Sequence, residues 1–196
     1  TPPIVFINAS AIGYYGNSGS KEVDESSPPG NNFLTEIVSQ WEQAAQPAID
    51  AGIRTVFIRS GVVLATEDSA LAKMLLPFKL GLGGRVGSGK QYMSWIALED
   101  EIRAIEFILQ QPDISGPINL CSPCAVTNNE FSQTLAKVLN RPAIFPLPEF
   151  VVRLVFGEMG ELLLLEGCNV KPKKLTDLGF EFTYPILKDA LIQQID

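Results

Sequence analysis

Short apolar runs alternate with helical patterns along the chain, and this alternation constrains the fold more than any other feature. Ile4–Ile7 and Arg54–Ile58 are typical of strands buried on both faces, and Ile118–Cys121 is a third predicted strand. Apolar residues at helical spacing predict helices over Phe33–Ile49, Ser69–Leu80, Ile102–Leu109 and Asn129–Leu139. Strands that alternate with helices of this length predict βαβ units around a parallel sheet.

Local signals set the ends of two helices. Pro47 should kink the first helix or end its first part, because proline removes a helical hydrogen-bond donor, and Gly52 lies just past its close. Thr127 or Asn128 is placed to cap the helix that begins at Asn129.

The character of the chain changes after Arg141-Pro142, where short helices joined by Gly and Pro follow: Phe150–Phe156, Glu161–Leu165, Lys173–Leu178 and Leu187–Ile195. We therefore expect an α/β protein of two parts. Residues 1–140 should form a parallel sheet with helices and include a glycine-rich loop at 80–100. Residues 141–196 should form a smaller, mainly helical lobe.

Composition excludes several classes of protein. The chain of 196 residues is 46% hydrophobic and 19% charged, which is ample for a packed core. Its net charge of −7 argues against a nucleic-acid or anionic-membrane binder, and no apolar run approaches the roughly 18 residues that span a bilayer. The absence of histidine removes Ser-His-Asp hydrolases, Cys-His proteases and His-ligated metal sites.

The three cysteines allow two interpretations. Cys121-Ser-Pro-Cys124 could be a redox pair or half of a zinc site, or its thiols could serve as small buried hydrophobes. Cys168 does not complete a four-ligand site, so we expect no metal. An odd number of cysteines without a secretory signal predicts a reducing compartment, the cytoplasm or an organellar stroma or matrix.

The segment Leu80–Asp100 carries the strongest functional signal. Five of the ten residues from Gly81 to Lys90 are glycine, which suits a backbone that turns sharply or approaches a ligand closely. Gln91–Ile96 then reads as a strand, and Glu99-Asp100 opens a helix.

This layout resembles the substrate-side segment of extended short-chain dehydrogenase/reductases, and Ser94-Trp95-Ile96 is similar to an atypical branch called epimerase family proteins. The resemblance covers the whole chain and implies the C-terminal part of a protein of the NAD(P)-dependent epimerase/dehydratase superfamily, with NADP or NAD as cofactor. It also implies that residues 1–140 form part of a doubly wound, Rossmann-like parallel sheet. Its further motifs are Gly116–Asn119, Asn129–Phe131, Leu139–Ala143, Gly157-Glu158, Pro172–Leu175 and Gly179–Phe182.

The resemblance implies three catalytic candidates. Phe6–Gly16 resembles the family segment S-S-A-x-V-Y-G, whose hydroxyl binds the reacting oxygen of the substrate. Ser10 supplies that hydroxyl if the doubled tyrosine is a one-residue insertion; otherwise Ala11 takes the position. Alternatively, Ser10 ends a strand and satisfies local backbone groups. Tyr14 or Tyr15 could act as the acid, or both could form an aromatic wall against the cofactor.

The family's Tyr-x-x-x-Lys pair, which transfers and tunes the proton, falls at Leu34 and Val38. Neither side chain can transfer a proton. The resemblance therefore implies an atypical active site, in which ordinary dehydrogenase chemistry is in doubt.

Cofactor contacts are implied at the ends of the first two strands. Arg59–Leu64 resembles a family turn whose backbone contacts the nicotinamide carboxamide. Arg59 ends a buried strand and needs a charged partner, for which Glu42 would serve. The implied cofactor-binding residues are Ala9, Ser10, Arg59, Gly61 and Val62.

Arg85, Lys90, Gln91 and Ser94 are the candidates to bind an anionic or nucleotide-sugar-like substrate. Arg85 and Lys90 could instead be solvated charges of the loop. We expect Trp95 in the core, and Asp100 resembles a helix-opening aspartate that satisfies free amides.

The phosphate-binding turn of a dinucleotide fold does not follow the first strand, since Gly13, Gly16 and Gly19 precede a polar loop. We expect a separate N-terminal nucleotide-binding segment to complete the sheet beside Ile4–Ile7, which would otherwise present an open apolar edge. The resemblance also implies a homodimer through the helix Phe33–Ile49; alternatively, the whole apolar stripe of this helix packs on the sheet.

Two functions remain open. The first is an NAD(P)-binding oxidoreductase or epimerase-like protein acting on a small molecule that the sequence does not identify. The second is a non-catalytic, nucleotide-binding regulatory protein, similar to a cell-division inhibitor, that acts through partners.

Overall fold

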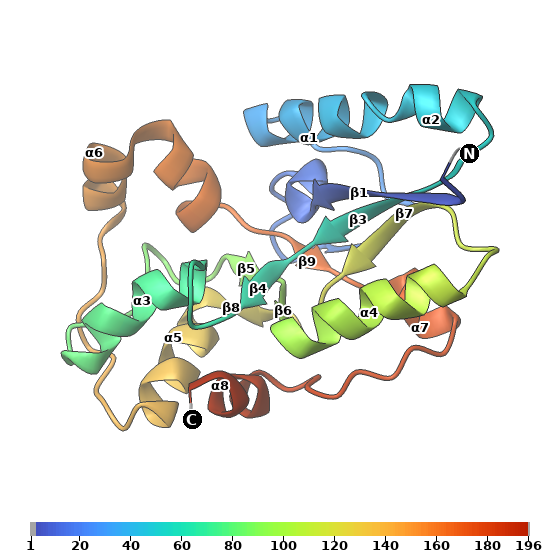
Figure 1. Ribbon diagram of the computed structural model, residues 1–196. Coiled ribbons are helices and arrows are strands. Elements are labelled where there is room, and N and C mark those ends of the chain that lie inside the picture. Colours follow the sequence, from blue (N-terminus) through green and yellow to red (C-terminus); the bar gives the residue numbers. More distant parts are fainter. Residues whose placement is uncertain (1–2, 196) are drawn as a thin grey trace.

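The computed structural model describes residues 3–195 and contains a three-stranded parallel sheet in the order β1-β3-β7 (Figure 1). The strands are β1 (Val5–Ala11), β3 (Arg54–Ser60) and β7 (Gly116–Leu120). Their register places Ser10 beside Arg59, and Arg59 beside Asn119. Three polar residues therefore lie in one row near the carboxyl ends of the strands. The α/β class and the parallel sheet expected from the sequence are confirmed.

Helices cover both faces of this sheet. α1 (Phe33–Gln43) and α2 (Gln46–Asp50) lie on one face and α4 (Leu98–Gln110) on the other (Figure 1). The first predicted helix ends before Pro47, which lies in the first turn of α2, where proline costs no hydrogen bond. α4 begins four residues earlier than Ile102, because the acidic residues that precede Ile102 already form its first turn.

Two small strand pairs extend the structure beyond the sheet. β4 (Val62–Leu64) pairs in parallel with β6 (Trp95–Ala97), and β5 (Tyr92–Met93) pairs antiparallel with β8 (Val126–Thr127). The predicted single strand Gln91–Ile96 is therefore wrong. It divides at Ser94, whose carbonyl accepts from Val62 N while its hydroxyl bonds to the backbone of Cys168 and Val170.

A second core lies below these pairs. α3 (Ala70–Lys79), α5 (Asn128–Val138) and α8 (Leu187–Ile195) surround the fully buried Trp95, as expected for that side chain. Thr127 caps α5 through a reciprocal capping box with Glu130, which confirms the first of the two predicted caps.

The C-terminal part holds α6 (Glu149–Gly160), the π-helical turn η2 (Glu161–Leu165), β9 (Asn169–Val170), α7 (Lys173–Asp177) and α8. α6 turns at Gly157, whose φ of 59° favours glycine. β9 pairs with β2 (Glu22–Val23), and α8 packs against α5, so contacts cross the expected boundary at residue 140. The division at that residue stays a prediction.

β1 is the edge strand of the sheet. Within residues 3–195 it pairs with β3 alone, and Ile4, just before it, is 89% exposed. Its second edge therefore offers unpaired backbone groups. In the same residues, no helix has the length and apolar character needed to cross a bilayer.

Candidate functional site

The carboxyl ends of the parallel strands position the candidate site. Ser10 comes from β1, Arg59 from β3 and Asn119 from β7, and the short 3-10 helix η1 (Ile12–Tyr15) follows β1 directly. These three residues are in register, so their side chains point to the same face of the sheet, the face that α1 covers. Ligands of open α/β sheets bind at this end of the strands.

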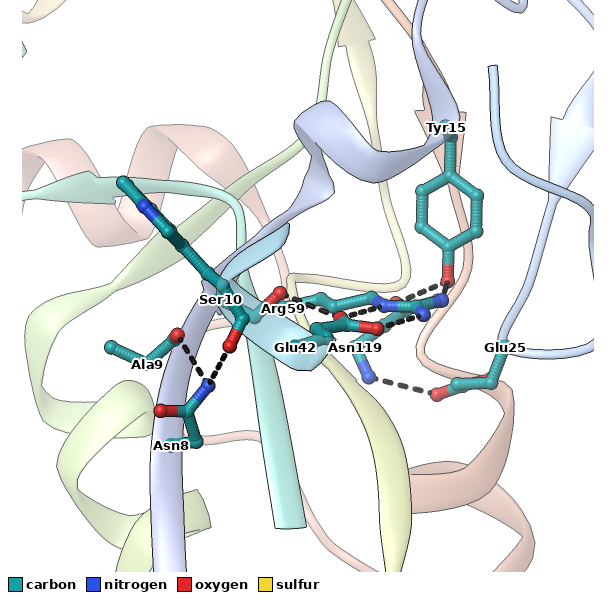
Figure 2. Close-up of polar contacts among 9 residues, drawn as sticks. Asn8, Ala9, Ser10, Tyr15, Glu25, Glu42, Arg59 and Asn119 are labelled. Carbon is teal, nitrogen blue, oxygen red and sulfur yellow. Dashed lines mark hydrogen bonds and ion pairs between the residues drawn. The ribbon is translucent and has the colours of Figure 1, made fainter. Parts of the chain in front are cut away.

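Arg59 and Glu42 form the ionic centre of the site (Figure 2). Arg59 Nε donates to Glu42 Oε1 at 2.7 Å and Nη2 donates to Oε2 at 2.8 Å, a bidentate geometry. The arginine side chain is only 3% exposed, so the carboxylate neutralises a buried charge. The predicted partner of Arg59 is thereby confirmed.

Ser10 belongs to the same network. Its hydroxyl donates to Glu42 Oε1 at 2.7 Å, since the ion-paired carboxylate can only accept (Figure 2). The proton of Ser10 is thus engaged, while its oxygen lone pairs can still accept a hydrogen bond.

Tyr15 is held on both sides of its hydroxyl. The oxygen accepts from Arg59 Nη1 at 3.0 Å, and the proton goes to Asn119 Oδ1 at 2.7 Å (Figure 2). Burial raises the pKa of Tyr15 to about 12, although the Arg59 cation acts in the opposite direction. Tyr15 is therefore suited to hold Arg59 in place.

Tyr14 lies on the other side of the guanidinium. Its ring centroid is 3.4 Å from Arg59 Cζ, a cation–π contact, and the ring meets Tyr15 edge-on at 5.4 Å. Tyr14 is partly exposed, and its hydroxyl makes no hydrogen bond within residues 3–195. Among the three catalytic candidates it alone has a free hydroxyl in this part of the chain.

The predicted cofactor residues lie around the same strand ends. Ala9 is exposed on β1, and Gly61 and Val62 follow β3. A Cβ at Gly61 would lie 2.7 Å from the Ser94 carbonyl oxygen, so glycine is required for the chain to pass there. The structure therefore brings Ser94 next to Gly61.

The side chains of the four predicted substrate residues do not point to one common site. Gln91 Nε2 donates to the carbonyls of Val86 (3.0 Å) and Leu164 (2.8 Å), and the Ser94 hydroxyl is buried against Cys168 and Val170. Arg85 Nη1 donates to the carbonyl of Ser88 in its own loop, and Lys90 is exposed. Substrate binding by these four residues stays a prediction.

Asp100 has a different structural role from the expected one. Its carboxylate accepts from the backbone amides of Thr183 and Tyr184, both at 2.8 Å, and from Arg103 at 3.0 Å. It holds the C-terminal segment instead of the free amides of α4. Because the two amides lie more than 80 residues from Asp100 in the sequence, no local sequence pattern predicts these contacts.

Sequence reasoning missed two members of the site, Asn119 and Glu25, and one buried carboxylate on the opposite face of the sheet, Glu101 of α4. Asn119 supports Tyr15, and a polar residue in a buried strand was a usable signal. Glu25 Oε1 accepts from Asn119 N at 3.0 Å (Figure 2). Glu101 Oε1 accepts from the Ser60 hydroxyl at 2.5 Å, while its buried Oε2 has no partner in the described residues, and burial raises its pKa to about 7.

The three cysteines differ in solvent exposure. Cys121 and Cys168 are buried free thiols, whereas Cys124 is exposed. Burial raises the pKa of Cys168 to about 12, so its thiol stays protonated near neutral pH. Within residues 3–195, no three His, Cys, Asp or Glu residues are grouped to hold a metal ion.

The sequence of this chain is similar to those of known proteins. A family model described as a domain of unknown function (DUF1731) matches residues 147–194. The chain is 46% identical to the epimerase family protein Mb2239 of Mycobacterium bovis over 94% of its own length. It is 42% identical to the mouse (Mus musculus) epimerase family protein SDR39U1 over 97% of its length. The chain is homologous to the epimerase family proteins. It spans 62% of the length of the first relative and 65% of the second.

Solved structures agree with this homology. A crystal structure of the human epimerase family protein SDR39U1 (isoform 2) with NADPH aligns with a TM-score of 0.93 at 38% identity, over 98% of this chain and 65% of that one. A nucleoside-diphosphate sugar epimerase from Corynebacterium glutamicum aligns with a TM-score of 0.81 at 30% identity, over 98% of this chain and 37% of that one. The Rossmann-like fold predicted from the sequence is confirmed.

Proposed function

We propose that this chain forms the substrate side of an NAD(P)-dependent oxidoreductase or epimerase, with NADPH as the preferred cofactor. The observation that carries the proposal is the 0.93 TM-score, at 38% identity, to a human relative whose crystal structure contains NADPH. The regulatory alternative would bind the same nucleotide, so oxidation of NADPH by the whole protein distinguishes the two roles.

The residues of this chain fit the nicotinamide half of such a cofactor. Ala9 is small and exposed near the end of β1, and the partly exposed Gly61 directly follows β3, so both lie at the end of the strands where this fold binds its ligands. Bound NADPH would supply a hydride to a carbonyl carbon, and the task of this chain is to bind the carbonyl oxygen and give it a proton. In this proposal a further nucleotide-binding segment pairs with the open edge of β1 and holds the pyrophosphate.

Tyr14 is the proton donor in this proposal. Leu34 and Val38, to which the resemblance assigns the places of the family's Tyr-Lys pair, lie on the face of α1 that packs against η1. A Cβ at Gly13 would be 3.6 Å from Leu34 Cβ and 3.7 Å from Val38 Cγ2. Tyr14 is the next residue of η1, and its partly exposed phenol makes no hydrogen bond within residues 3–195. Arg59 holds its ring, and the Ser10 oxygen accepts a hydrogen bond from the substrate or cofactor.

Tyr14→Phe tests this role in the whole protein. We expect unchanged NADPH affinity and roughly a hundredfold slower single-turnover oxidation of NADPH against a panel of carbonyl compounds, since a positioned acid contributes about 10²–10⁴ in rate. Tyr184→Phe, on the C-terminal segment, should retain the wild-type rate. Equal rates for Tyr14→Phe and wild type would remove Tyr14 from the mechanism, and absence of NADPH binding would remove the proposed function. The homodimer and the cytoplasmic or organellar location stay predictions.

A further inference from the structure

Glu101 is a buried carboxyl group that the proposed mechanism does not use. It lies in the first turn of α4 and is 8% exposed. Its Oε1 is 2.5 Å from the Ser60 hydroxyl oxygen, and its Oε2 is buried without a hydrogen-bond partner in residues 3–195. Burial without a second donor penalises the charged form of a carboxyl group. The neutral form of Glu101 is therefore favoured.

The surroundings of Glu101 do not compensate a negative charge, since no salt bridge includes it in the described part of the chain. β4 and β6, which contact α4, carry no titratable side chain. The charged or titratable groups nearest to it along α4 and the adjoining strand ends are the exposed Glu99, the Asp100–Arg103 pair, Arg59 on the opposite face of the sheet and the buried thiol of Cys121. Burial raises the pKa of Glu101 to about 7, so its charge changes near neutral pH.

The protonation of Glu101 sets the direction of its hydrogen bond with Ser60. An ionised carboxylate can only accept, so it engages the proton of the Ser60 hydroxyl. A neutral carboxyl group can instead donate its own proton to Ser60 Oγ, and the separation of 2.5 Å suits either direction. In the second case the Ser60 hydroxyl is free to donate to a third group.

Ser60 lies where such a third group can bind. It is the last residue of β3 and is partly exposed, at the end of the strands where this fold binds its ligands. The amide of Gly61 donates to the Leu120 carbonyl and the amide of Val62 to the Ser94 carbonyl, both at 2.9 Å. The two backbone donors that follow β3 are therefore already engaged, and the Ser60 hydroxyl is the next donor at this point of the chain.

We propose that Ser60 donates a hydrogen bond to the carboxamide oxygen of the nicotinamide, and that Glu101 is a positioning residue that releases the Ser60 proton for this bond while its own carboxyl group is protonated. This assignment rests on the proposed function, because it takes the nicotinamide to lie at the carboxyl ends of β1 and β3. Ionisation of Glu101 recaptures the Ser60 proton and thereby weakens cofactor binding.

The test is a fluorescence titration of the whole protein with NADPH at about pH 6 and about pH 8. The dissociation constant should rise roughly five- to tenfold between them, because one hydrogen bond is lost as the binding-competent fraction falls. Glu101→Gln keeps an amide donor toward Ser60 at every pH and should bind at the higher pH as tightly as wild type does at the lower.

Glu106→Gln is the matched control, because Glu106 is exposed on the same helix, and it should keep the wild-type pH dependence. The phosphate of NADPH also titrates near pH 6, so the effect is measured as the difference between Glu101→Gln and this control. Ser60→Ala removes the donor and should bind at the lower pH as weakly as wild type does at the higher. Circular dichroism confirms that the variants fold, and Ser60→Ala decides the question if Glu101→Gln does not.

Two results would overturn the assignment. One is a Glu101→Gln variant with the same pH dependence of NADPH affinity as Glu106→Gln, which would leave Glu101 with a role in stability only. The other is a Ser60→Ala variant with wild-type affinity at about pH 6. A wild-type protein that binds no NADPH at either pH would instead refute the proposed function itself.

Discussion

At the scale of single residues, the burial of Arg59 determines how the site is built. A guanidinium that is 3% exposed must be neutralised and hydrogen-bonded, and Glu42 and Tyr15 together satisfy that requirement. Removing the carboxylate would leave an unpaired buried cation.

Glu42→Gln should therefore lower the free energy of unfolding by about 3 kcal/mol, the usual cost of breaking a buried ion pair from one side. Urea denaturation measures the change. Glu36→Gln is the matched control, because Glu36 is exposed on the same helix. A loss of stability in Glu42→Gln no larger than in this control would contradict the role of the ion pair.

Glu101 gives the stability of the protein a pH dependence. Burial raises its pKa from 4.5 to about 7, so between these values the folded state keeps a proton that the unfolded state has released. Its contribution is fully present below pH 4.5 and is lost as pH rises through 7. In urea denaturation over this pH range, Glu101→Gln should abolish the part of the pH dependence of the unfolding free energy that Glu101 causes. A variant with the wild-type pH dependence would be evidence against this role of Glu101.

Part of the candidate site could be predicted from the sequence and part could not. Arg59 and Glu42 were paired in advance because a lone charge at the end of a buried strand requires a counter-charge. The bond from Tyr15 to Asn119 joins residues 104 apart and depends on strand register, which no local pattern specifies.

At the scale of elements, helices were more predictable than short strands. The periodic stretches of α3, α5 and α8 cover most of each helix, and α3 and α5 begin after the capping residues Ser69 and Thr127. The two-residue strands β2 and β9 are too short to show an alternating pattern, and only their tertiary pairing defines them. The same holds for β5 and β8.

The capping box of α5 gives an element-level prediction. Thr127→Ala removes the hydroxyl that accepts from Glu130 N and should lower the free energy of unfolding by about 1 kcal/mol. Thr134→Ala makes the same substitution inside the same helix and should cost less. Thermal or urea denaturation compares the two, and a reversed order would contradict the cap.

At the scale of the whole molecule, the open edge of β1 is the main asymmetry of the sheet. β3 is paired on both sides, whereas β1 has one partner within residues 3–195. Relatives of which this chain spans 62% or 65% have additional length that could cover such an edge.

Hydrogen exchange followed by mass spectrometry tests the edge. In residues 1–196 alone, we expect the amides of β1 that point away from β3 to exchange much faster than those of β3, because only backbone pairing slows exchange there. In the whole protein both strands should be protected. Equal protection in the isolated chain would show that β1 is covered by other means.

Glu25 joins two parts of the molecule that the chain order keeps far apart. Its carboxylate accepts from the amide of Asn119, at the end of β7, and from the amide of Lys174, in α7. The helix that follows β9 cannot swing outward without pulling on the strand that steadies Tyr15 and, through it, Arg59. A displacement of α7 would therefore be transmitted through Asn119 to the hydroxyl of Tyr15 and to the guanidinium of Arg59.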